Sequence, residues 1–457
     1  MDNTMTNTMP RPVYLVGIGG VGMSALARYF RLKGCPVAGY DRTASPLTRK
    51  MSEEEGIPVA YEDDEREVDE LYRTPDNDPL VIYTPAVPPD NRLLTFFREQ
   101  GVALHKRSEV LGMISRGMKA ICVAGTHGKT TVSTMTAFLL HSSGVGCNAF
   151  LGGVSTNFNT NLLVNPASPF VVIEADEYDR SFLHLHPHAS LITSMDADHL
   201  DVYGTREHLA EAFEQFARQT SGALFARKGL RIESREVNGY YAVDERADYA
   251  AVHPRVEGAG YRFDYASRDA YIPDLHLTFP GRMNVENAAA AITLALHAGV
   301  TPKEVRRALP EFRGVARRFD VQASGKVIYV DDYAHHPREI EAALTSAREL
   351  WPGKRLTAAF QPHLYTRTRD FYAGFAESLS LADEVILLEI YPAREEPIPG
   401  VSSRLIADRL TVPHALVSRE EFPGIVESRV TDGVFMTVGA GDIDRFVPAF
   451  KKMFTTD

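Results

Sequence analysis

The stretch AICVAGTHGKTTVSTMTAFLLH, residues 120–141, decides the fold class of this 457-residue chain. It opens with an apolar run at 120–124, which predicts a buried strand, and passes through a glycine-containing turn into a predicted helix at 130–141. In such a turn, backbone N–H groups and the positive end of the helix can cradle a phosphate. The stretch therefore predicts an α/β fold with a nucleotide-binding loop.

The turn departs from the usual nucleotide-loop pattern at one position, because Val123 stands where that pattern has its first glycine. The chemistry is kept, since Gly125 and Gly128 let the backbone approach phosphates and Lys129 supplies a positive charge. Thr130 supplies a hydroxyl for Mg²⁺. We therefore predict an ATP site. The predicted loop residues are Gly125, Thr126, His127, Gly128, Lys129, Thr130 and Thr131.

Acidic residues follow two neighbouring strands of the predicted sheet. Residues 174–177 come directly after the apolar run at 170–173, and residues 196–201 follow the run at 189–193. Open α/β sheets bind ligands at the carboxyl ends of their strands, and Mg²⁺ prefers oxygen ligands. Together with the phosphate loop, these residues predict a magnesium site.

A second glycine-rich turn lies at 17–22, between a predicted strand at 13–16 and a predicted helix at 23–32. A strand at 37–40 follows and ends in Asp41, nineteen residues beyond Gly22, as in the dinucleotide fingerprint. NAD is one interpretation. The glycines recognise a pyrophosphate and not a nicotinamide, so a UDP-sugar is the other, and the residues alone leave both open.

The length of the chain exceeds what one hydrophobic core supports, and α/β alternation restarts twice. We predict three domains, at 1–115, 116–312 and 313–457. An antiparallel meander is expected within 229–280, and an alanine-rich helix at 284–298 closes the second domain. Further strands are predicted at 80–83, 327–330, 355–360, 384–388 and 434–438, and further helices at 94–100, 337–350 and 370–381.

Composition excludes several classes of function. A net charge of −11 argues against a broad nucleic-acid or anionic-membrane surface. The three cysteines are too widely spaced for a metal or redox motif, which favours a reducing compartment. Residues 1–12 are polar, and no run of about 18 apolar residues exists for membrane insertion. We expect a cytoplasmic protein.

Several motifs together resemble the Mur ligases, the ATP-dependent amide-forming enzymes of peptidoglycan precursor synthesis. They are Gly-Ile-Gly-Gly-Val-Gly-Met at 17–23, Asp-Asp-Tyr-Ala-His-His-Pro at 331–337 and Gln-Pro-His-Leu-Tyr-Thr-Arg-Thr-Arg at 361–369. Weaker matches extend the resemblance over nearly the whole chain, and its strongest motifs are most similar to the alanine-adding branch.

The resemblance implies an N-terminal Rossmann-like domain for the UDP-sugar, a central P-loop ATPase-type sheet and a C-terminal Rossmann-like domain. The implied substrates are UDP-N-acetylmuramate, L-alanine and ATP with Mg²⁺, in a monomer or homodimer. The implied reaction passes through an acyl phosphate and depends on positioning and charge neutralisation.

The resemblance also implies residue roles. Lys129, Glu174, His199 and Arg367 would be catalytic, and Thr130, Glu174 and His199 would hold Mg²⁺. Asn284, Asn287, Arg317 and Asp332 would add to the ATP site. The UDP-sugar would contact Gly17, Gly19, Gly20, Gly22, Met23 and Asp41. Tyr333, His335, His363 and Arg367 would place alanine and the muramoyl carboxylate.

The chain departs from the family pattern in places. Leu364 and Met283 stand where relatives often carry Arg and His, so polar contacts are not expected there. No lysine lies between Lys129 and Lys228, which leaves no candidate for the carbamylated lysine of several sister ligases. The alanine-adding branch likewise lacks that lysine.

Three alternatives stay open. A recycling ligase of the same family, which adds a whole peptide to the same UDP-sugar, would have a similar catalytic centre. An NAD-dependent dehydrogenase fits the turn at 17–22 but leaves Lys129 and its acidic partners unexplained. A non-catalytic module would bind ATP without turnover.

Overall fold

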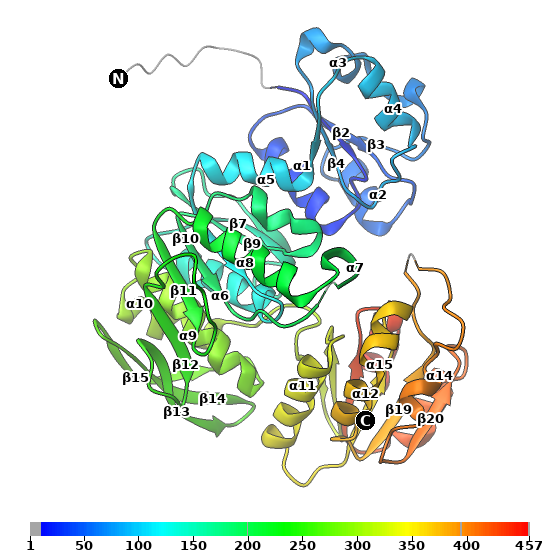
Figure 1. Ribbon diagram of the computed structural model, residues 1–457. Coiled ribbons are helices and arrows are strands. Elements are labelled where there is room, and N and C mark those ends of the chain that lie inside the picture. The colour runs from blue at the N-terminus through cyan, green and yellow to red at the C-terminus, as the bar shows by residue number, and fades with distance from the viewer. Residues whose placement is uncertain (1–10, 199, 394, 456–457) are drawn as a thin grey trace.

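The computed structural model describes residues 11–198, 200–393 and 395–455, and within these residues the strands form three sheets. Helices cover the sheets, and the three sheets follow one another along the chain (Figure 1). The predicted α/β class is confirmed.

The first sheet has the strand order β3-β2-β1-β4-β5, and all its pairs are parallel. This is a doubly wound, Rossmann-like arrangement, with a glycine turn after its central strand. The elements are β1 (Val13–Val16), α1 (Val21–Leu32), β2 (Val37–Tyr40), α2 (Pro46–Glu53), β3 (Val59–Ala60), α3 (Glu70–Arg73), β4 (Leu80–Tyr83), α4 (Arg92–Glu99), β5 (Leu104–Lys106) and α5 (Arg107–Arg116).

The second sheet has ten strands in the order β15-β14-β13-β12-β11-β10-β6-β9-β7-β8. Its strands are β6 (Lys119–Ala124), β7 (Asn148–Ser155), β8 (Thr160–Leu163), β9 (Phe170–Ala175), β10 (Ala189–Ile192), β11 (Ala223–Arg227), β12 (Gly239–Val243), β13 (Tyr249–Glu257), β14 (Gly260–Ser267) and β15 (Tyr271–Leu277). The helices are α6 (Lys129–His141), α7 (Leu200–Tyr203), α8 (Arg206–Gln219), α9 (Arg282–His297) and α10 (Pro302–Ala308).

The predicted meander is antiparallel only from β13 to β15. β12 pairs in parallel with both β11 and β13, so the meander continues the main sheet and is not a separate unit. Alternation along a strand reports that one face is buried, but it does not report which strand lies alongside. The prediction was therefore wrong for β12.

The third sheet has the order β16-β17-β21-β18-β19-β20, parallel except at β16. Its strands are β16 (Asp320–Ser324), β17 (Val327–Asp332), β18 (Leu356–Phe360), β19 (Glu384–Leu388), β20 (His414–Val417) and β21 (Gly433–Val438). The helices are α11 (Pro337–Leu350), α12 (Tyr365–Leu379), α13 (Arg404–Ala407), α14 (Phe422–Arg429) and α15 (Val447–Thr455).

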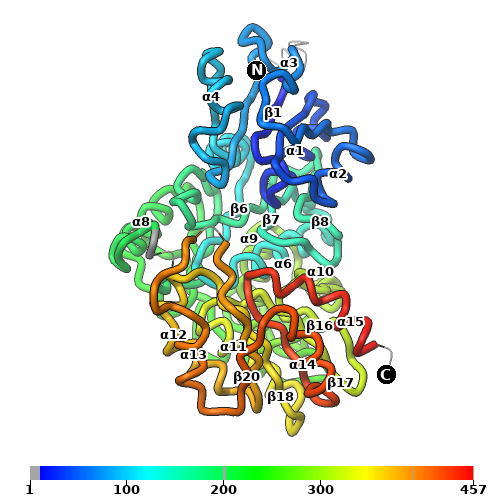
Figure 2. The backbone as a smooth tube through the Cα atoms, turned by 90° about the vertical axis from the view of Figure 1, so that its right-hand side faces the viewer, coloured from blue at the N-terminus to red at the C-terminus, as the bar shows by residue number. Residues whose placement is uncertain are grey.

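The central part of the chain packs against both the N-terminal and the C-terminal part. Helix α1 packs on β7 and β8, where the rings of Tyr29 and Phe150 lie 5.2 Å apart. On the other side, α11 packs against α9, which is itself buried on α6. Figure 2 shows the N-terminal sheet region above and the C-terminal one in front of the central sheet. The carboxyl ends of β6, β9 and β10 thus lie between the two neighbours.

Candidate functional site

The phosphate loop connects β6 to α6, and two of its glycines have backbone angles that side chains rarely adopt. Gly125 has a φ of 132° and Gly128, the N-cap of α6, has a φ of 80°. A Cβ atom at Gly125 would lie 2.0 Å from the hydroxyl oxygen of Thr193. The loop therefore runs close against the end of β10.

Hydrogen bonds from the residues after β10 hold the loop in place. The Ser194 Oγ accepts from the backbone N–H of His127 at 2.8 Å and lies 2.9 Å from Thr126 Oγ1. Thr126 Oγ1 in turn accepts from the N–H of Asp196 at 3.1 Å. Thr126 thus links the loop to the segment that follows β10.

Lys129 is nearly buried and is held by a carboxylate. Its Nζ donates to the Gly125 carbonyl at 2.6 Å and lies 3.0 and 2.7 Å from the two carboxylate oxygens of Glu177. Burial lowers the pKa of Lys129, but the charges of Glu177, Asp176 and Glu174 outweigh it and raise that pKa above its ordinary value. The ammonium is therefore protonated, and the carboxylate of Glu177 balances its positive charge.

Thr130 and Glu174 form an oxygen pair beside Lys129. The Thr130 hydroxyl donates to Glu174 Oε1 at 3.0 Å, and the Gly152 N–H donates to Oε2 at 3.0 Å. Burial raises the pKa of Glu174. The third predicted metal ligand, His199, lies outside the described residues. The two described oxygens suit a hard cation.

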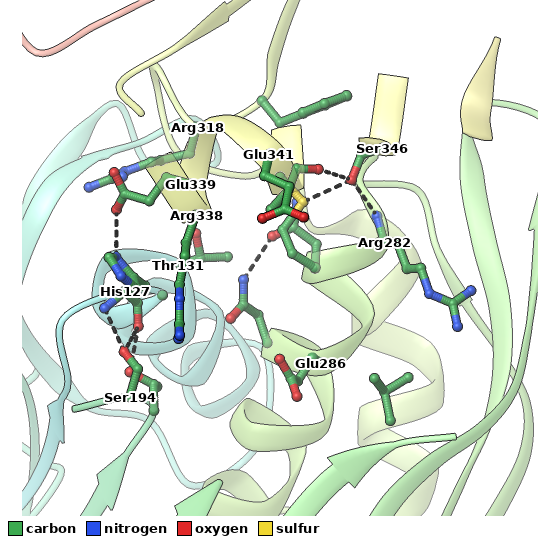
Figure 3. A pocket seen from close by; sticks show the side chains of 18 of the residues that line it. His127, Thr131, Ser194, Arg282, Glu286, Arg318, Arg338, Glu339, Glu341 and Ser346 are labelled. Atoms are coloured by element: carbon green, nitrogen blue, oxygen red, sulfur yellow. Dashed lines mark hydrogen bonds and ion pairs between the residues drawn. The ribbon is translucent and has the colours of Figure 1, made fainter. Parts of the chain in front are cut away.

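A cavity of about 550 Å³ opens beside the loop, between the central sheet and α11 (Figure 3). Seven predicted ATP residues line it, namely His127, Gly128, Thr130, Thr131, Asn284, Asn287 and Asp332. Gly125, Thr126 and Lys129 support the loop from outside the lining. The cavity is large enough for a nucleotide.

Arg317 does not line this cavity. Its guanidinium binds Asp331 at 3.1 Å and the Gly439 carbonyl at 2.6 Å, within the C-terminal part. The neighbouring Arg318 lines the cavity instead. A doubled arginine does not reveal which member faces outwards, because Arg317 lies in a turn before β16 with a left-handed φ of 62°, where strand alternation does not apply.

The turn after β17 carries the predicted acceptor residues. Asp332 accepts backbone N–H bonds from Phe319 and Ala334, both at 2.7 Å, and burial raises its pKa to about 7. Arg317 and Arg318 lie over the ring of Tyr333. Burial lowers the pKa of His335 to about 3, so its ring is neutral.

Arg367 and His363 come from the segment around the start of α12. Arg367 forms a buried ion pair of 2.8 Å with Asp198, which follows β10 in the central part. The His363 ring stacks on Tyr391 with centroids 5.8 Å apart. The charges of Arg367 and Asp198 both act on the pKa of His335, so the three groups lie within electrostatic range of one another. His363 lines neither of the two cavities beside the loop.

The N-terminal glycine turn borders a second cavity, of about 300 Å³. Gly20, Gly22 and Met23 line it, and so do Glu174 and Asp176 from the central sheet. The cavity therefore extends from the turn to the strand end beside Thr130.

Gly17, Gly19 and Asp41 shape the turn without lining the cavity. Gly17 has a φ of 86°, and Asp41 Oδ2 accepts from the Gly19 N–H at 2.8 Å while Oδ1 accepts from the Thr43 N–H at 3.0 Å. Both oxygens of Asp41 thus bind backbone. A dinucleotide ribose, which the NAD interpretation assigns to this carboxylate, would have to compete with these bonds.

Sequence reasoning missed several residues that the fold brings to the loop. Arg107 lines the smaller cavity, and Arg338 and Glu339 line the larger one. Ser194 was also missed, although its place directly after a predicted strand beside the loop is a signal that could have found it. No spacing rule connects Arg338 or Glu339 to a loop some 200 residues earlier.

Three family domains match the chain in order: "Mur ligase family, catalytic domain" at 12–119, "Mur ligase middle domain" at 123–295 and "Mur ligase, glutamate ligase domain" at 317–441. Curated relatives named UDP-N-acetylmuramate–L-alanine ligase include that of Phocaeicola vulgatus, 50% identical with 97% of each chain covered. That of Porphyromonas gingivalis is 47% identical, covering 97% of this chain and 99% of the relative.

Solved structures agree on the fold. A UDP-N-acetylmuramate-alanine ligase from Thermotoga maritima superposes with a TM-score of 0.81 at 29% identity, covering 97% of this chain and 99% of that one. A murein peptide ligase from Psychrobacter arcticus gives a TM-score of 0.67 at 21% identity, covering 97% and 98%. Among the described residues, no helix has the length and apolar character needed to cross a membrane.

Proposed function

The chain belongs to the Mur ligase family, and on this premise we propose that it joins L-alanine to the carboxylate of UDP-N-acetylmuramate at the expense of ATP. Relatives that are 47% to 50% identical bear this name, and the match covers nearly their whole length. The observation that carries the proposal is the phosphate loop of Lys129, which lies between a glycine-turn cavity on one side and the residues after β17 on the other.

The reaction has two steps. A muramoyl carboxylate oxygen attacks the γ-phosphorus of ATP, the bond to the β,γ-bridging oxygen breaks, and an acyl phosphate and ADP result. The amine of L-alanine then attacks the acyl carbon, loses a proton and expels phosphate as the amide forms. Negative charge collects on the phosphate oxygens in the first step, so a fixed cation beside them accelerates it.

Lys129 is the residue that we assign to this charge. Its ammonium is held by Glu177 in a nearly dry setting, where electrostatic interactions are strong. If the Lys129 ammonium turns from Glu177 to the phosphates, it exchanges one anionic partner for another. The lysine thereby stays paired throughout, and it serves as a catalytic residue.

We assign Mg²⁺ to Thr130 and Glu174, whose oxygens already lie 3.0 Å apart, with His199 as the third ligand. When bound there, the ion neutralises charge on the phosphate oxygens. Glu174 is held in place by the Gly152 N–H, which fixes one of its two oxygens.

The UDP-sugar is assigned to the turn of Gly17, Gly19, Gly20, Gly22, Met23 and Asp41. In support, the cavity beside this turn reaches Glu174, so a diphosphate at the turn would direct the sugar carboxylate towards the phosphate loop.

L-Alanine is assigned to the site that Arg367 and His335 share, with Tyr333 and His363 as further contacts. A planar guanidinium can bind a carboxylate through two hydrogen bonds. Arg367 binds the carboxylate of Asp198 through Nη2. A cytoplasmic location and a monomeric or homodimeric state belong to the same proposal.

Phosphate release from the purified protein tests the assignment. We expect turnover that requires ATP, UDP-N-acetylmuramate and L-alanine together, with NAD having no effect. Turnover with an alanyl-glutamyl-diaminopimelate tripeptide but not with alanine would assign the chain to peptide recycling. Binding of ATP without turnover under any acceptor would leave only a nucleotide-binding module.

A further inference from the structure

Helix α11 reaches across the boundary between the C-terminal and central parts through two adjacent side chains. Its first turn follows the N-cap His336 and carries Arg338 and Glu339. Arg338 Nη1 binds Asp196 Oδ1 at 2.5 Å, and Glu339 Oε1 lies 3.1 Å from Nδ1 of His127 (Figure 3). Both partners belong to the central part, and His127 belongs to the phosphate loop itself.

The four side chains form one row of alternating charge, because Nε2 of His127 faces Asp196 Oδ2 at 3.4 Å. The order is Arg338, Asp196, His127, Glu339, so α11 supplies both ends and the central part supplies the middle. We refer to these four residues as the clamp. Alternation lets each inner charge contact two opposite charges, which offsets the cost of burying them.

Burial alone would lower the pKa of His127, but its contacts with Asp196 and Glu339 raise it to about 9. The imidazole is therefore protonated at neutral pH. Its Nδ1 donates to Glu339, and its Nε2 lies 3.4 Å from Asp196 Oδ2 as an ion-pair contact. Its ring also lies against that of His336, with centroids 4.9 Å apart.

Glu339 has a second set of contacts that involve the acceptor residues. Its Oε2 accepts from the backbone N–H of His335 at 3.0 Å and lies 3.5 Å from Nδ1 of the same residue. A single carboxylate thus binds the phosphate loop with one oxygen and the turn after β17 with the other. No other described hydrogen bond from that turn reaches the loop.

We propose that the clamp sets the distance between the loop that holds ATP and the turn that receives the amino acid, with His127 and Glu339 as positioning residues. This inference deepens the proposed function and rests on it. The phosphate loop keeps its own anchors to Ser194 and Thr193, so the loop should still hold ATP when the contact with Glu339 is lost.

A double-mutant cycle with Glu339→Gln and His127→Asn tests the proposal. Each single variant should lower kcat/KM for L-alanine about tenfold or more, since a charge-assisted hydrogen bond is lost. The ATP affinity of Glu339→Gln, measured by calorimetry, should stay within about threefold of the parent or improve, because Glu339 is an anion beside the nucleotide cavity. The double variant should lose no more than the worse single one.

Asp383→Asn is the matched control, because it also turns an acid into an amide but breaks an ion pair with Arg348 inside the C-terminal part. It should keep kcat/KM near that of the parent. Losses that multiply in the double variant, or an equal fall in ATP affinity, would overturn the clamp as a positioning device.

A measurement without turnover separates this inference from the proposed function. Spin labels at the exposed positions Lys303 and Lys354, in a Cys35→Ser background, report the distance between the central and C-terminal parts. Glu339→Gln should broaden the distance distribution, and Asp383→Asn should not. If the parent protein makes no product with alanine, the function fails while the labels still decide the clamp; an unchanged distribution in Glu339→Gln rejects it.

Discussion

Lys129 combines burial with a fixed partner, and this pairing decides how its removal will act. Its side chain is 12% exposed, and that of Glu177 is fully buried. A substitution of Lys129 therefore removes a charge from the phosphates and also leaves a buried carboxylate without this counter-charge. These two effects have to be separated before a loss of activity can be assigned to the lysine charge at the phosphates.

Lys129→Ala should reduce turnover by at least about 100-fold, since a fixed charge aimed at the transferring phosphoryl group is lost. Calorimetric binding of UDP-N-acetylmuramate should persist, because its assigned turn lies in another sheet. Lys129→Ala with Glu177→Gln restores neutrality and guards against misfolding. Lys228→Ala, a lysine with 43% exposure paired to Glu245, is the control. Full activity in Lys129→Ala would remove the phosphate-loop assignment.

His127 should make stability depend on pH in a defined window. Its pKa in the folded protein, about 9, exceeds the ordinary 6.5, so its stabilising contribution is complete below pH 6.5 and disappears as pH rises through 9. The groups that face it do not titrate there. Asp196, which binds His127, has a lowered pKa. The hydrogen bond and charge of His127 hold the pKa of Glu339 well below its ordinary value against burial, and burial lowers that of His336 to about 4.

The check is the thermal midpoint of wild type minus that of His127→Asn, followed from pH 6 to pH 10. The difference should shrink as pH rises, from a contribution of at most about 3 kcal/mol. A difference that grows with pH, or stays constant, contradicts the charged imidazole.

At the level of elements, the phosphate loop depends on the close approach of β6 and β10. Gly125→Ala would force a methyl group into Thr193 and add strain at a φ of 132°. We expect a loss of about 2 kcal/mol or more in unfolding free energy and weaker ATP binding. Gly353→Ala has a φ of 77° but open space around it, so it controls for strain alone; equal losses would exclude the steric cause.

Elements that alternate in an α/β pattern were predictable from the sequence. The predicted helix at 337–350 coincides with α11, because Pro337 can occupy only the first turn and the apolar spacing continues to Leu350. The predicted start of α12 at 370 was late, since the helix begins at Tyr365 after Leu364 in a left-handed conformation. Nothing in residue type marks Leu364 for that conformation.

The site residues at the ends of neighbouring strands could be predicted from the sequence. Contacts between residues far apart in the chain could not. Glu174 lies at the carboxyl end of β9, opposite Val123 of β6, so its nearness to Thr130 follows from parallel pairing. Arg367 and Asp198 are 169 residues apart, and only the placement of the C-terminal part against the central part brings them together. The hydrophobic periodicity of the sequence predicts local elements and not such contacts.

For the whole molecule, the Arg367–Asp198 pair links the central and C-terminal parts through charges that are 9% and 4% exposed. Arg367→Met should lower the unfolding free energy by about 3 kcal/mol, since it leaves the Asp198 charge buried without this partner. Adding Asp198→Asn should recover part of the loss. Urea unfolding of the two variants decides this, and a double variant weaker than Arg367→Met would contradict it.

Gly152 has a consequence for inhibitor design. A methyl group there would lie 2.2 Å from the carboxylate oxygens of Glu174, so the partition between the two cavities is kept thin by a missing side chain. The glycine-turn cavity touches that carboxylate on one side, and Thr130 opens to the nucleotide cavity on the other. A compound with one anionic group in each cavity would gain binding energy from both. Phosphate-loop hydrolases that lack the glycine-turn cavity would bind only one of its two groups.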